Sequence, residues 1–249
     1  MCLSRSRKLM CVAFGIMLSA SAQAAPITID FDSLPGMLNS PGTSVPLASQ
    51  LSGQFLSTLG VSFSSQASYV AVVNHNTPPG CSGPGVCLTV SMPNVVGGVK
   101  SDGTLSYGTP VTISFFDLTN PTVKGITDFV SIRGDMVPLP GASATMEAFD
   151  ALGQSLGSVS AFDSTVGLTL SINALGIHSL VLTQNSANFL YDGTIGFDNL
   201  QFNAVSAVPQ VPEPASLLLL GSGLMGLMWL RKRYRRTQPN IAQWSCDAQ

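Results

Sequence analysis

The sequence predicts an all-β domain, a β-sandwich or a barrel, between residues 25 and 205. Short runs in which apolar and polar residues alternate recur along this stretch, for example in Val111–Phe115 and Leu168–Ile172. Such alternation is typical of strands with one buried face. Glycine, proline, asparagine, aspartate and serine separate the runs at spacings of about 8 to 12 residues, which favours a sandwich or barrel over alternating strands and helices.

The strands expected from these runs follow in chain order. They are Ile27–Phe31, Val61–Phe63, Tyr69–Val73, Leu88–Met92, Val111–Phe115, Asp128–Ile132, Ala144–Phe149, Ser155–Phe162, Leu168–Ile172, Leu180–Thr183 and Ile195–Phe202. One weak helical pattern, Leu47–Leu59, has apolar residues four positions apart. A single domain of this length can bury an adequate core.

Charge is scarce and unevenly distributed. Charged residues make up 10% of the chain, against about 25% in an ordinary soluble domain. Between the two basic ends the only basic residues are Lys100, Lys124 and Arg133, whereas all acidic residues except Glu213 and Asp247 lie there. An acidic middle would repel phosphate backbones, so nucleic acid is excluded as a partner.

The N-terminus has the three parts of a secretory signal peptide. A basic stretch with Arg5, Arg7 and Lys8 precedes the short apolar run Leu9–Leu18. The small residues of Ala22-Gln23-Ala24 then form a cleavage site. An apolar run this short cannot span a bilayer. We therefore expect residues 1–24 to be removed between Ala24 and Ala25, with export through the Sec machinery.

A second apolar run, residues 215–230, predicts a transmembrane helix. A helix of its 16 residues is about 24 Å long, slightly short of a bilayer core of about 30 Å. A basic cluster follows within residues 231–249, and basic residues stay on the cytoplasmic side of a membrane. This cluster comprises Arg231, Lys232, Arg233, Arg235 and Arg236. The charge pattern places the ectodomain in the periplasm and the tail in the cytoplasm.

A proline-rich linker, residues 206–214, joins the ectodomain to this run. It contains Pro212, Glu213 and Pro214, and each proline holds the residue before it in an extended conformation. Val-Pro-Glu-Pro, a short apolar span and an arginine-rich cluster in this order resemble the PEP-CTERM sorting domain. In that family the tail usually ends soon after the cluster, whereas here Thr237–Gln249 follows.

The resemblance implies a life cycle and a set of partners. PEP-CTERM proteins are exported in Gram-negative bacteria that make exopolysaccharide, anchored transiently in the inner membrane, and cleaved by exosortase, a membrane cysteine transpeptidase. Pro212, Glu213 and Pro214 would be the recognition signature. After cleavage the ectodomain would reach the cell surface or the medium. The ectodomain pattern is similar to the jelly-roll-like domains of such proteins.

Two similar tetrapeptides stand at the ends of the ectodomain, Phe31-Asp32-Ser33-Leu34 and Phe197-Asp198-Asn199-Leu200. Sandwiches often bring their first and last strands together, so we expect the two to be neighbours. Asp32, Asp198 and Asn199 would then offer oxygen ligands for a structural Ca²⁺ ion. Asp30 would instead cap a strand end. We expect no other metal and no cofactor.

Cysteine use indicates one disulfide. Of the five cysteines, Cys81 and Cys87 are the two that remain in the exported part. The Gly-Pro-Gly between them favours a turn that brings their Cα atoms together, and the periplasm is oxidising. A thiolate metal site is the alternative, but two cysteines without a nearby third ligand make a poor zinc shell.

Three other patterns resemble chemical motifs but fit structural roles better. Gly153–Gly157 matches the G-x-S-x-G elbow around Ser155, yet a β-like run follows where a helix is required. Gly221–Gly226 matches a dinucleotide loop but lies inside the apolar run, where Ser222 and Gly226 favour helix packing. His75, His178 and Glu147 do not form a convincing catalytic set. We expect no catalytic residues.

Three functions remain for the exported domain. The first is a non-enzymatic surface or matrix protein, associated with biofilm or exopolysaccharide. The second is a carbohydrate-binding module, which is weakened because both tryptophans, Trp229 and Trp244, lie outside the domain, and sugar sites usually offer exposed aromatic rings. The third is a secreted hydrolase.

Overall fold

Alternating burial along the strands builds the core. In β7 (Val111–Asp117) the side chains of Val111, Ile113 and Phe115 are buried while those between them are partly exposed. β9 (Ser143–Phe149) and β4 (Val61–Ser64) alternate in the same way. Successive side chains of a strand point to opposite faces of a sheet, so this pattern covers one face and leaves the other in water.

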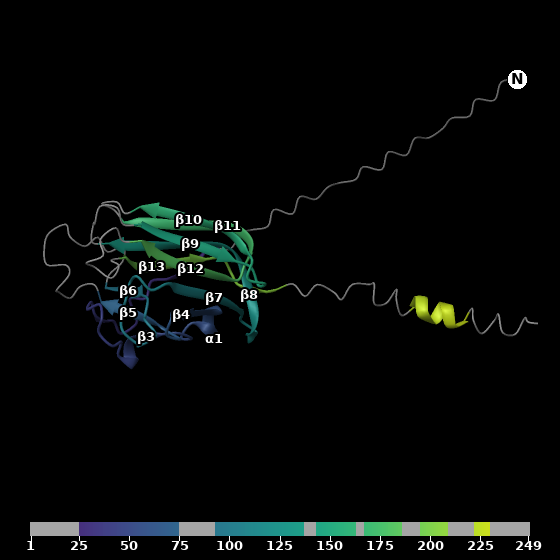
Figure 1. Cartoon of the computed structure of the whole chain (residues 1–249), viewed down its shortest axis with the longest axis horizontal. Coiled ribbons are helices and arrows are strands. Elements are labelled where there is room, and N and C mark those ends of the chain that lie inside the picture. Colours follow the sequence, from purple (N-terminus) through teal and green to yellow (C-terminus); the bar gives the residue numbers. More distant parts are fainter. Residues whose placement is uncertain are drawn as a thin grey trace, which may run out of the picture. The chain divides into compact units, whose positions relative to one another are not determined.

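The computed structural model describes residues 25–74, 93–136, 143–162, 167–185, 195–208 and 222–229 (Figure 1). It divides into two units, Met1–Ala207 and Val208–Gln249. The remaining elements of the first unit are β1 (Ile27–Ile29), β2 (Met37–Leu38), η1 (Leu47–Ser49), β3 (Gln50–Leu51), α1 (Leu56–Leu59), β5 (Val70–Asn74), β6 (Asn94–Gly97), β8 (Asn120–Met136), β10 (Ser155–Phe162), β11 (Leu168–Ile177), β12 (Ser179–Asn185), β13 (Ile195–Phe202) and β14 (Ser206–Ala207).

The strands form two layers. The first sheet has the order β11-β8-β13-β6-β5, and the second has the order β10-β9-β12-β7-β4. The long strand β8 joins the layers, because its start pairs with β7 and its later part pairs with β11 and β13. Strands β6 to β13 thus form two interlocked antiparallel sheets, β6-β13-β8-β11 and β7-β12-β9-β10, which is the strand order of a jelly roll.

The main core lies between the two sheets. Its largest fully buried side chains include five phenylalanines, Phe31, Phe63, Phe115, Phe197 and Phe202. A second apolar cluster lies on the other face of β5 and β6, because Val72 and Val96 belong to the main core whereas their neighbours Val73 and Val95 do not. Both faces of these two strands are therefore buried.

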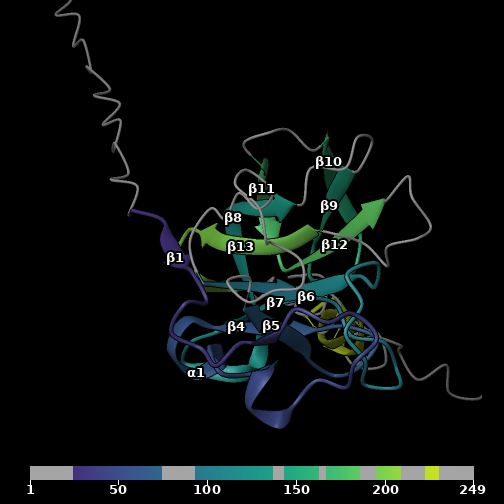
Figure 2. The same cartoon turned by 90° about the vertical axis from the view of Figure 1, so that its left-hand side faces the viewer.

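The structure confirms the β-sandwich. The first and last strands of the domain are neighbours, since Ile27, Thr28 and Ile29 of β1 pair with Phe202, Gln201 and Leu200 of β13 (Figure 2). The helical pattern predicted at Leu47–Leu59 is present only as the short pieces η1 and α1. Leu51 is used instead in β3, where it pairs with Val70.

Candidate functional site

The chain leaves the sandwich along the start of β8. Ser206 and Ala207 of β14 pair with Ile126 and Gly125. Just before β14, the backbone N–H of Asn203 donates to the carbonyl of Phe129 at 3.3 Å. The segment that precedes the expected linker is thus held on β8 by backbone pairing.

Side chains reinforce this attachment. The buried hydroxyl of Thr127 donates to the Asn203 carbonyl at 2.9 Å, and Nδ2 of Asn203 donates to Oδ1 of Asp128 at 2.8 Å. Gly125 permits the close approach, because a Cβ there would lie 2.5 Å from a methyl of Val205 and 2.6 Å from the backbone of Phe116. The exit segment is therefore attached to the sandwich by side-chain as well as backbone bonds.

His178 supports the same piece of β8. It is buried between β11 and β12, and its Nδ1 lies 3.0 Å from the carbonyl oxygen of Gly125. Because a carbonyl only accepts, Nδ1 carries the proton. The His178 ring packs edge-on against Phe116, with ring centres 6.0 Å apart. His178 therefore has a structural position in the fold rather than a place on an exposed surface.

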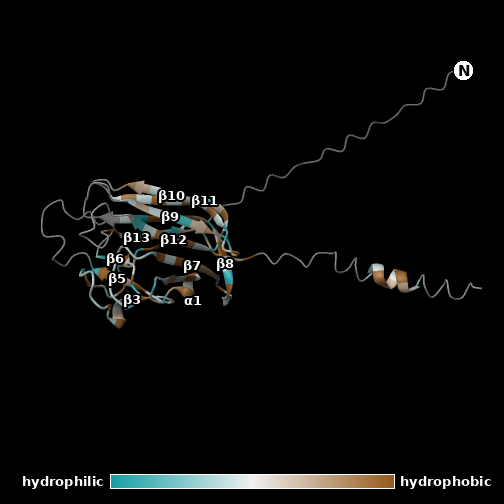
Figure 3. Ribbon diagram, in the orientation of Figure 1, coloured by the Kyte–Doolittle hydropathy of each residue, from teal (hydrophilic) through white to brown (hydrophobic). Residues whose placement is uncertain are grey.

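The second unit is described as a helix over residues 222–229. All its side chains are exposed within the chain, and apolar residues predominate (Figure 3). They are Leu224, Met225, Leu227, Met228 and Trp229. Across the described residues, no helix has both the length and the hydropathy needed to cross a bilayer. Pro212, Glu213, Pro214 and the basic cluster lie outside the described residues, as do Ala24, His75, Cys81 and Cys87.

The two similar tetrapeptides lie at the seam between β1 and β13. In the first, Phe31 has φ +58° and begins a turn that Leu34 closes by donating to the Phe31 carbonyl at 3.0 Å. Oδ1 of Asp32 accepts the backbone N–H of Asn94 at 3.0 Å. Asp30 caps this region as expected, since its Oδ1 accepts the Asp32 N–H at 3.3 Å.

Asn94, which the sequence did not single out, organises this seam. It is 1% exposed, and its Nδ2 donates to the carbonyls of Leu34 at 2.7 Å, Phe31 at 3.1 Å and Asp32 at 3.4 Å. Its Oδ1 is buried without a hydrogen-bond partner, and a Cβ on Gly36 would collide with that oxygen. The side chain is thus a clamp on the first turn of the domain.

In the second tetrapeptide, the Asp198 carboxylate accepts a hydrogen bond from the next residue. Asp198 is fully buried, and its Oδ1 accepts the backbone N–H of Asn199 at 2.6 Å. Asn199 has φ +48° and lies at an irregularity in the pairing of β13 with β8. Oxygens of Asp32 and Asp198 therefore accept backbone N–H groups. Within the described ranges, no group of three or more histidine, cysteine, aspartate or glutamate residues is placed to hold a metal ion.

The G-x-S-x-G match is a β-hairpin, as predicted. Asp150 begins the turn, where its backbone N–H donates to Gln154 and its carbonyl accepts the N–H of Gly153. Its Oδ1 accepts the N–H groups of Leu152 and Gln154, both at 2.8 Å. Ser155 lies on β10 and donates to Oε1 of Glu147 at 2.7 Å. A strand follows the serine, so the strand–turn–helix of a nucleophile elbow is not formed.

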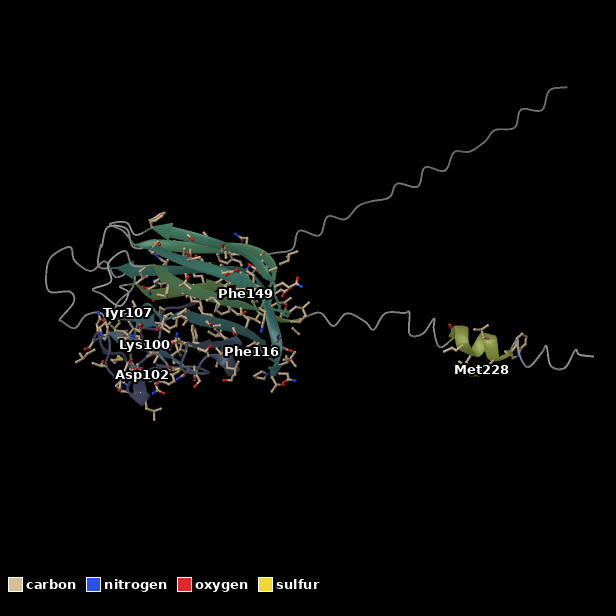
Figure 4. The ribbon with its side chains drawn as sticks, viewed as in Figure 1. Lys100, Asp102, Tyr107, Phe116, Phe149 and Met228 are labelled. Atoms are coloured by element: carbon tan, nitrogen blue, oxygen red, sulfur yellow. The ribbon has the colours of Figure 1, made fainter. Side chains whose placement is uncertain are left out.

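Burial and local hydrogen bonds shift two acid–base equilibria at the other end of the sandwich, near the residues labelled in Figure 4. Burial raises the pKa of the Tyr107 phenol, whose hydroxyl donates to Oδ1 of Asn39 at 3.1 Å. Hydrogen bonds from the side chain and backbone of Thr104 lower the pKa of the exposed Asp102 carboxyl. Both residues stabilise local structure.

The outer face of the second sheet carries many hydroxyl side chains. Their residues alternate with buried ones and lie in cross-strand rows, as where Thr145 pairs with Thr183 on one side and Ser160 on the other. The hydroxyls of Thr145 and Ser160 share a hydrogen bond of 2.7 Å. No lysine or arginine occupies a described outward position there. The hydroxyl residues are Ser62, Ser64, Thr112, Ser114, Ser143, Thr145, Ser158, Ser160, Ser179 and Thr183.

Comparison with known proteins gives one informative match. A family model for the PEP-CTERM protein-sorting motif matches residues 210–233. No curated protein matches the chain significantly. One similar solved structure is a DUF4465 family protein from Bacteroides caccae, with 13% identity, a TM-score of 0.37, and coverage of 79% of this chain and 97% of that one.

A second solved structure is the enzymatically active domain of tailspike protein 4 of bacteriophage CBA120. It has 14% identity and a TM-score of 0.31 over 61% of this chain, which spans only 20% of the tailspike chain. The match to the sorting motif confirms the resemblance seen in the sequence. Residues 210–233 are a PEP-CTERM protein-sorting motif, which implies recognition by exosortase, export, and membrane anchoring before processing.

Proposed function

We propose that this protein is an exported, non-enzymatic component of the cell surface or extracellular matrix of a Gram-negative bacterium, associated with exopolysaccharide. The sorting motif at residues 210–233 carries the proposal. The motif indicates how the protein is sorted but not what the exported domain does. The non-enzymatic part of the proposal therefore rests on the structure of the sandwich. The G-x-S-x-G match of the sandwich forms a β-hairpin, in which the Ser155 hydroxyl donates to Glu147.

The proposed route begins with removal of residues 1–24 and insertion of residues 215–230 in the inner membrane. The basic cluster from Arg231 to Arg236 stays in the cytoplasm, which leaves Pro212, Glu213 and Pro214 at the outer surface of the membrane. The two prolines keep this stretch extended and without proline N–H donors. Such a segment is accessible to a transpeptidase, and cleavage releases the sandwich.

The test uses the full chain in a Gram-negative host that has exosortase. We expect Glu213→Ala to leave an uncleaved precursor in the inner-membrane fraction, as deletion of exosortase would. Asp247→Ala, which removes an acidic residue outside the matched range, is the control and should be processed normally. Release of the Glu213→Ala protein at the normal rate would contradict the proposal.

The second candidate, a carbohydrate-binding module, is favoured by the outer face of the second sheet. Its rows of hydroxyls, without cations among the described outward positions, suit a neutral, hydroxyl-rich polymer better than an anionic one. A glycan array with the released protein tests this. Binding that Thr145→Ala and Ser160→Ala abolish, and that Thr169→Ala on the first sheet does not, would favour the carbohydrate-binding function.

A further inference from the structure

The same tripeptide, Ala-Leu-Gly, exposes a leucine at two places in the sandwich. Ala151-Leu152-Gly153 lies in the turn that joins β9 to β10, and Ala174-Leu175-Gly176 forms an irregularity within β11, near its end. Both glycines have left-handed backbones, with φ +80° and +84°. Leu152 is 84% exposed and Leu175 is 86% exposed. Each tripeptide thus projects a large apolar side chain into water, where a polar residue would fit the same backbone.

Both tripeptides lie beside the same short piece of β8. The Lys124 ammonium donates to the Ala151 carbonyl at 2.5 Å. Just after the tripeptide of β11, Ile177 pairs with Thr127, and Nδ1 of His178 contacts the Gly125 carbonyl. β14 pairs with this piece as well, so the leucines gather at the end where the chain leaves the sandwich.

Two further exposed apolar residues belong to this end. Leu118 lies in the turn between β7 and β8, and Val123 lies near the start of β8. Figure 4 places Phe116, which precedes this hairpin, and Phe149, which precedes the Leu152 turn, toward the same end of the sandwich. We call Leu118, Val123, Leu152 and Leu175 the exit-end leucine patch, although it includes one valine.

The charges around the exit-end leucine patch are mostly acidic and internally bonded. Asp117 accepts from the backbone and hydroxyl of Thr119, and Asp150 accepts from its own turn. Asp128 accepts from Asn203. The nearby cation, Lys124, is bonded to a carbonyl. A partner for this patch is therefore not an anionic surface, because the net charge around it is negative.

We propose that the exit-end leucine patch rests on the outer surface of the lipid bilayer while the protein is anchored, with its leucines in the interfacial layer of zwitterionic lipid. The proposal rests on the proposed function, since it requires the anchored precursor. Residues 208–214 connect β14 to the expected span, and seven extended residues reach at most about 25 Å. The chain therefore keeps this end of the sandwich close to the membrane.

The chemistry of the patch suits that position. Apolar side chains that project from turns gain free energy when they enter the boundary between headgroups and acyl chains. The polar backbone of the Leu152 turn is already bonded within the protein, so insertion of that leucine requires little loss of hydrogen bonds.

The test is photocrosslinking from a benzophenone-bearing residue placed at position 152, 175 or 47 of the full chain. Leu47 is the matched control, because it is 83% exposed but lies on η1, before the strand that pairs with β5 at the far edge of the first sheet. The host lacks exosortase, so the precursor stays anchored. After irradiation of the membranes, mass spectrometry identifies the molecule attached to each position.

We expect phospholipid adducts from positions 152 and 175 at several times the yield from position 47. Equal lipid yields from the three positions of an anchored precursor would overturn the inference alone, as would adducts from 152 and 175 that consist mainly of another protein or a second copy. Absence of the precursor from the membrane fraction would overturn both the inference and the proposed function. Each labelled protein must resist protease as the unlabelled one does, which shows that it is folded.

Discussion

Replacing Asn94 tests whether one buried amide holds the first turn of the sandwich to β6. Its Nδ2 has three carbonyl acceptors, of which those of Leu34 and Phe31 are within 3.1 Å. A hydrogen bond contributes about 0.5–1.5 kcal/mol net, and a buried group left unsatisfied costs about 1–3 kcal/mol. We therefore expect Asn94→Ala to lower the free energy of unfolding by about 3 kcal/mol, or about 6–12 °C in Tm for a domain of this size.

The assay is urea unfolding of the mature chain, with Tm as a second readout. Asn94→Asp tests the hydrogen bonds separately from the packing. It keeps the side-chain volume but replaces the amide donor by a carboxylate oxygen that faces three carbonyls. It should therefore lower the free energy of unfolding at least as much as Asn94→Ala. Asn173→Ala, at an exposed position on β11, is the control and should stay within about 0.5 kcal/mol of the parent. If Asn94→Ala lowered the free energy of unfolding no more than Asn173→Ala does, the proposed stabilisation of the first turn by Asn94 would be refuted.

Thr127, Tyr107 and the disulfide expected from the sequence each allow a further test. Thr127→Val keeps the volume but removes the hydroxyl from the Asn203 carbonyl, so it should cost about 1–2 kcal/mol in urea unfolding; a value matching exposed Thr169→Val would contradict it. Burial raises the pKa of Tyr107 above its unfolded value of about 10, so its contribution is complete below that pH and is lost as pH rises; stability measured from pH 8 to pH 11 should fall less steeply in Tyr107→Phe, and parallel curves would argue against the burial effect. Non-reducing peptide mapping of exported protein should show Cys81 joined to Cys87, closing a small loop worth about 2 kcal/mol; two thiols that react with alkylating reagent would exclude the bond.

The sequence predicted strands with one exposed face well, and it also predicted β5 and β13, whose side chains are mostly buried. β7, β9 and β11 alternate along most of their length, and their expected ranges Val111–Phe115, Ala144–Phe149 and Leu168–Ile172 lie within the observed strands or coincide with them. β6 was missed because Asn94–Gly97 is only four residues long and all four are buried, so no alternation marks it. A segment covered on two sides by tertiary packing has no periodic signal of its own.

β8 was predicted too short for a related reason. Only Asp128–Ile132 was expected, whereas the strand runs from Asn120 to Met136. Its first residues are largely exposed and pair with β7 and β14 rather than with the core strands. Pairing with distant segments, which local composition does not encode, extends the strand.

The sorting motif was predictable because it is a contiguous stretch of sequence, residues 210–233. The buried clamp at Asn94 and the exit-end leucine patch were not, because each depends on segments distant in sequence. One signal for the patch was present: Ala-Leu-Gly occurs after Asp150 and again after Asn173. Both copies place a large apolar residue before a glycine with a left-handed backbone.

The attachment of β14 sets how far the cleavage signal reaches. β14 holds only two paired residues on β8, and short terminal strands open at low free energy. Opening β14 as far as Asn203 would add four residues of extended chain, or about 14 Å, to the connection between sandwich and membrane. The Thr127 and Asp128 bonds to Asn203 stop the opening there. The paired state of β14 gives the shorter connection, and this is the state that the proposed contact of the exit-end leucine patch with lipid favours.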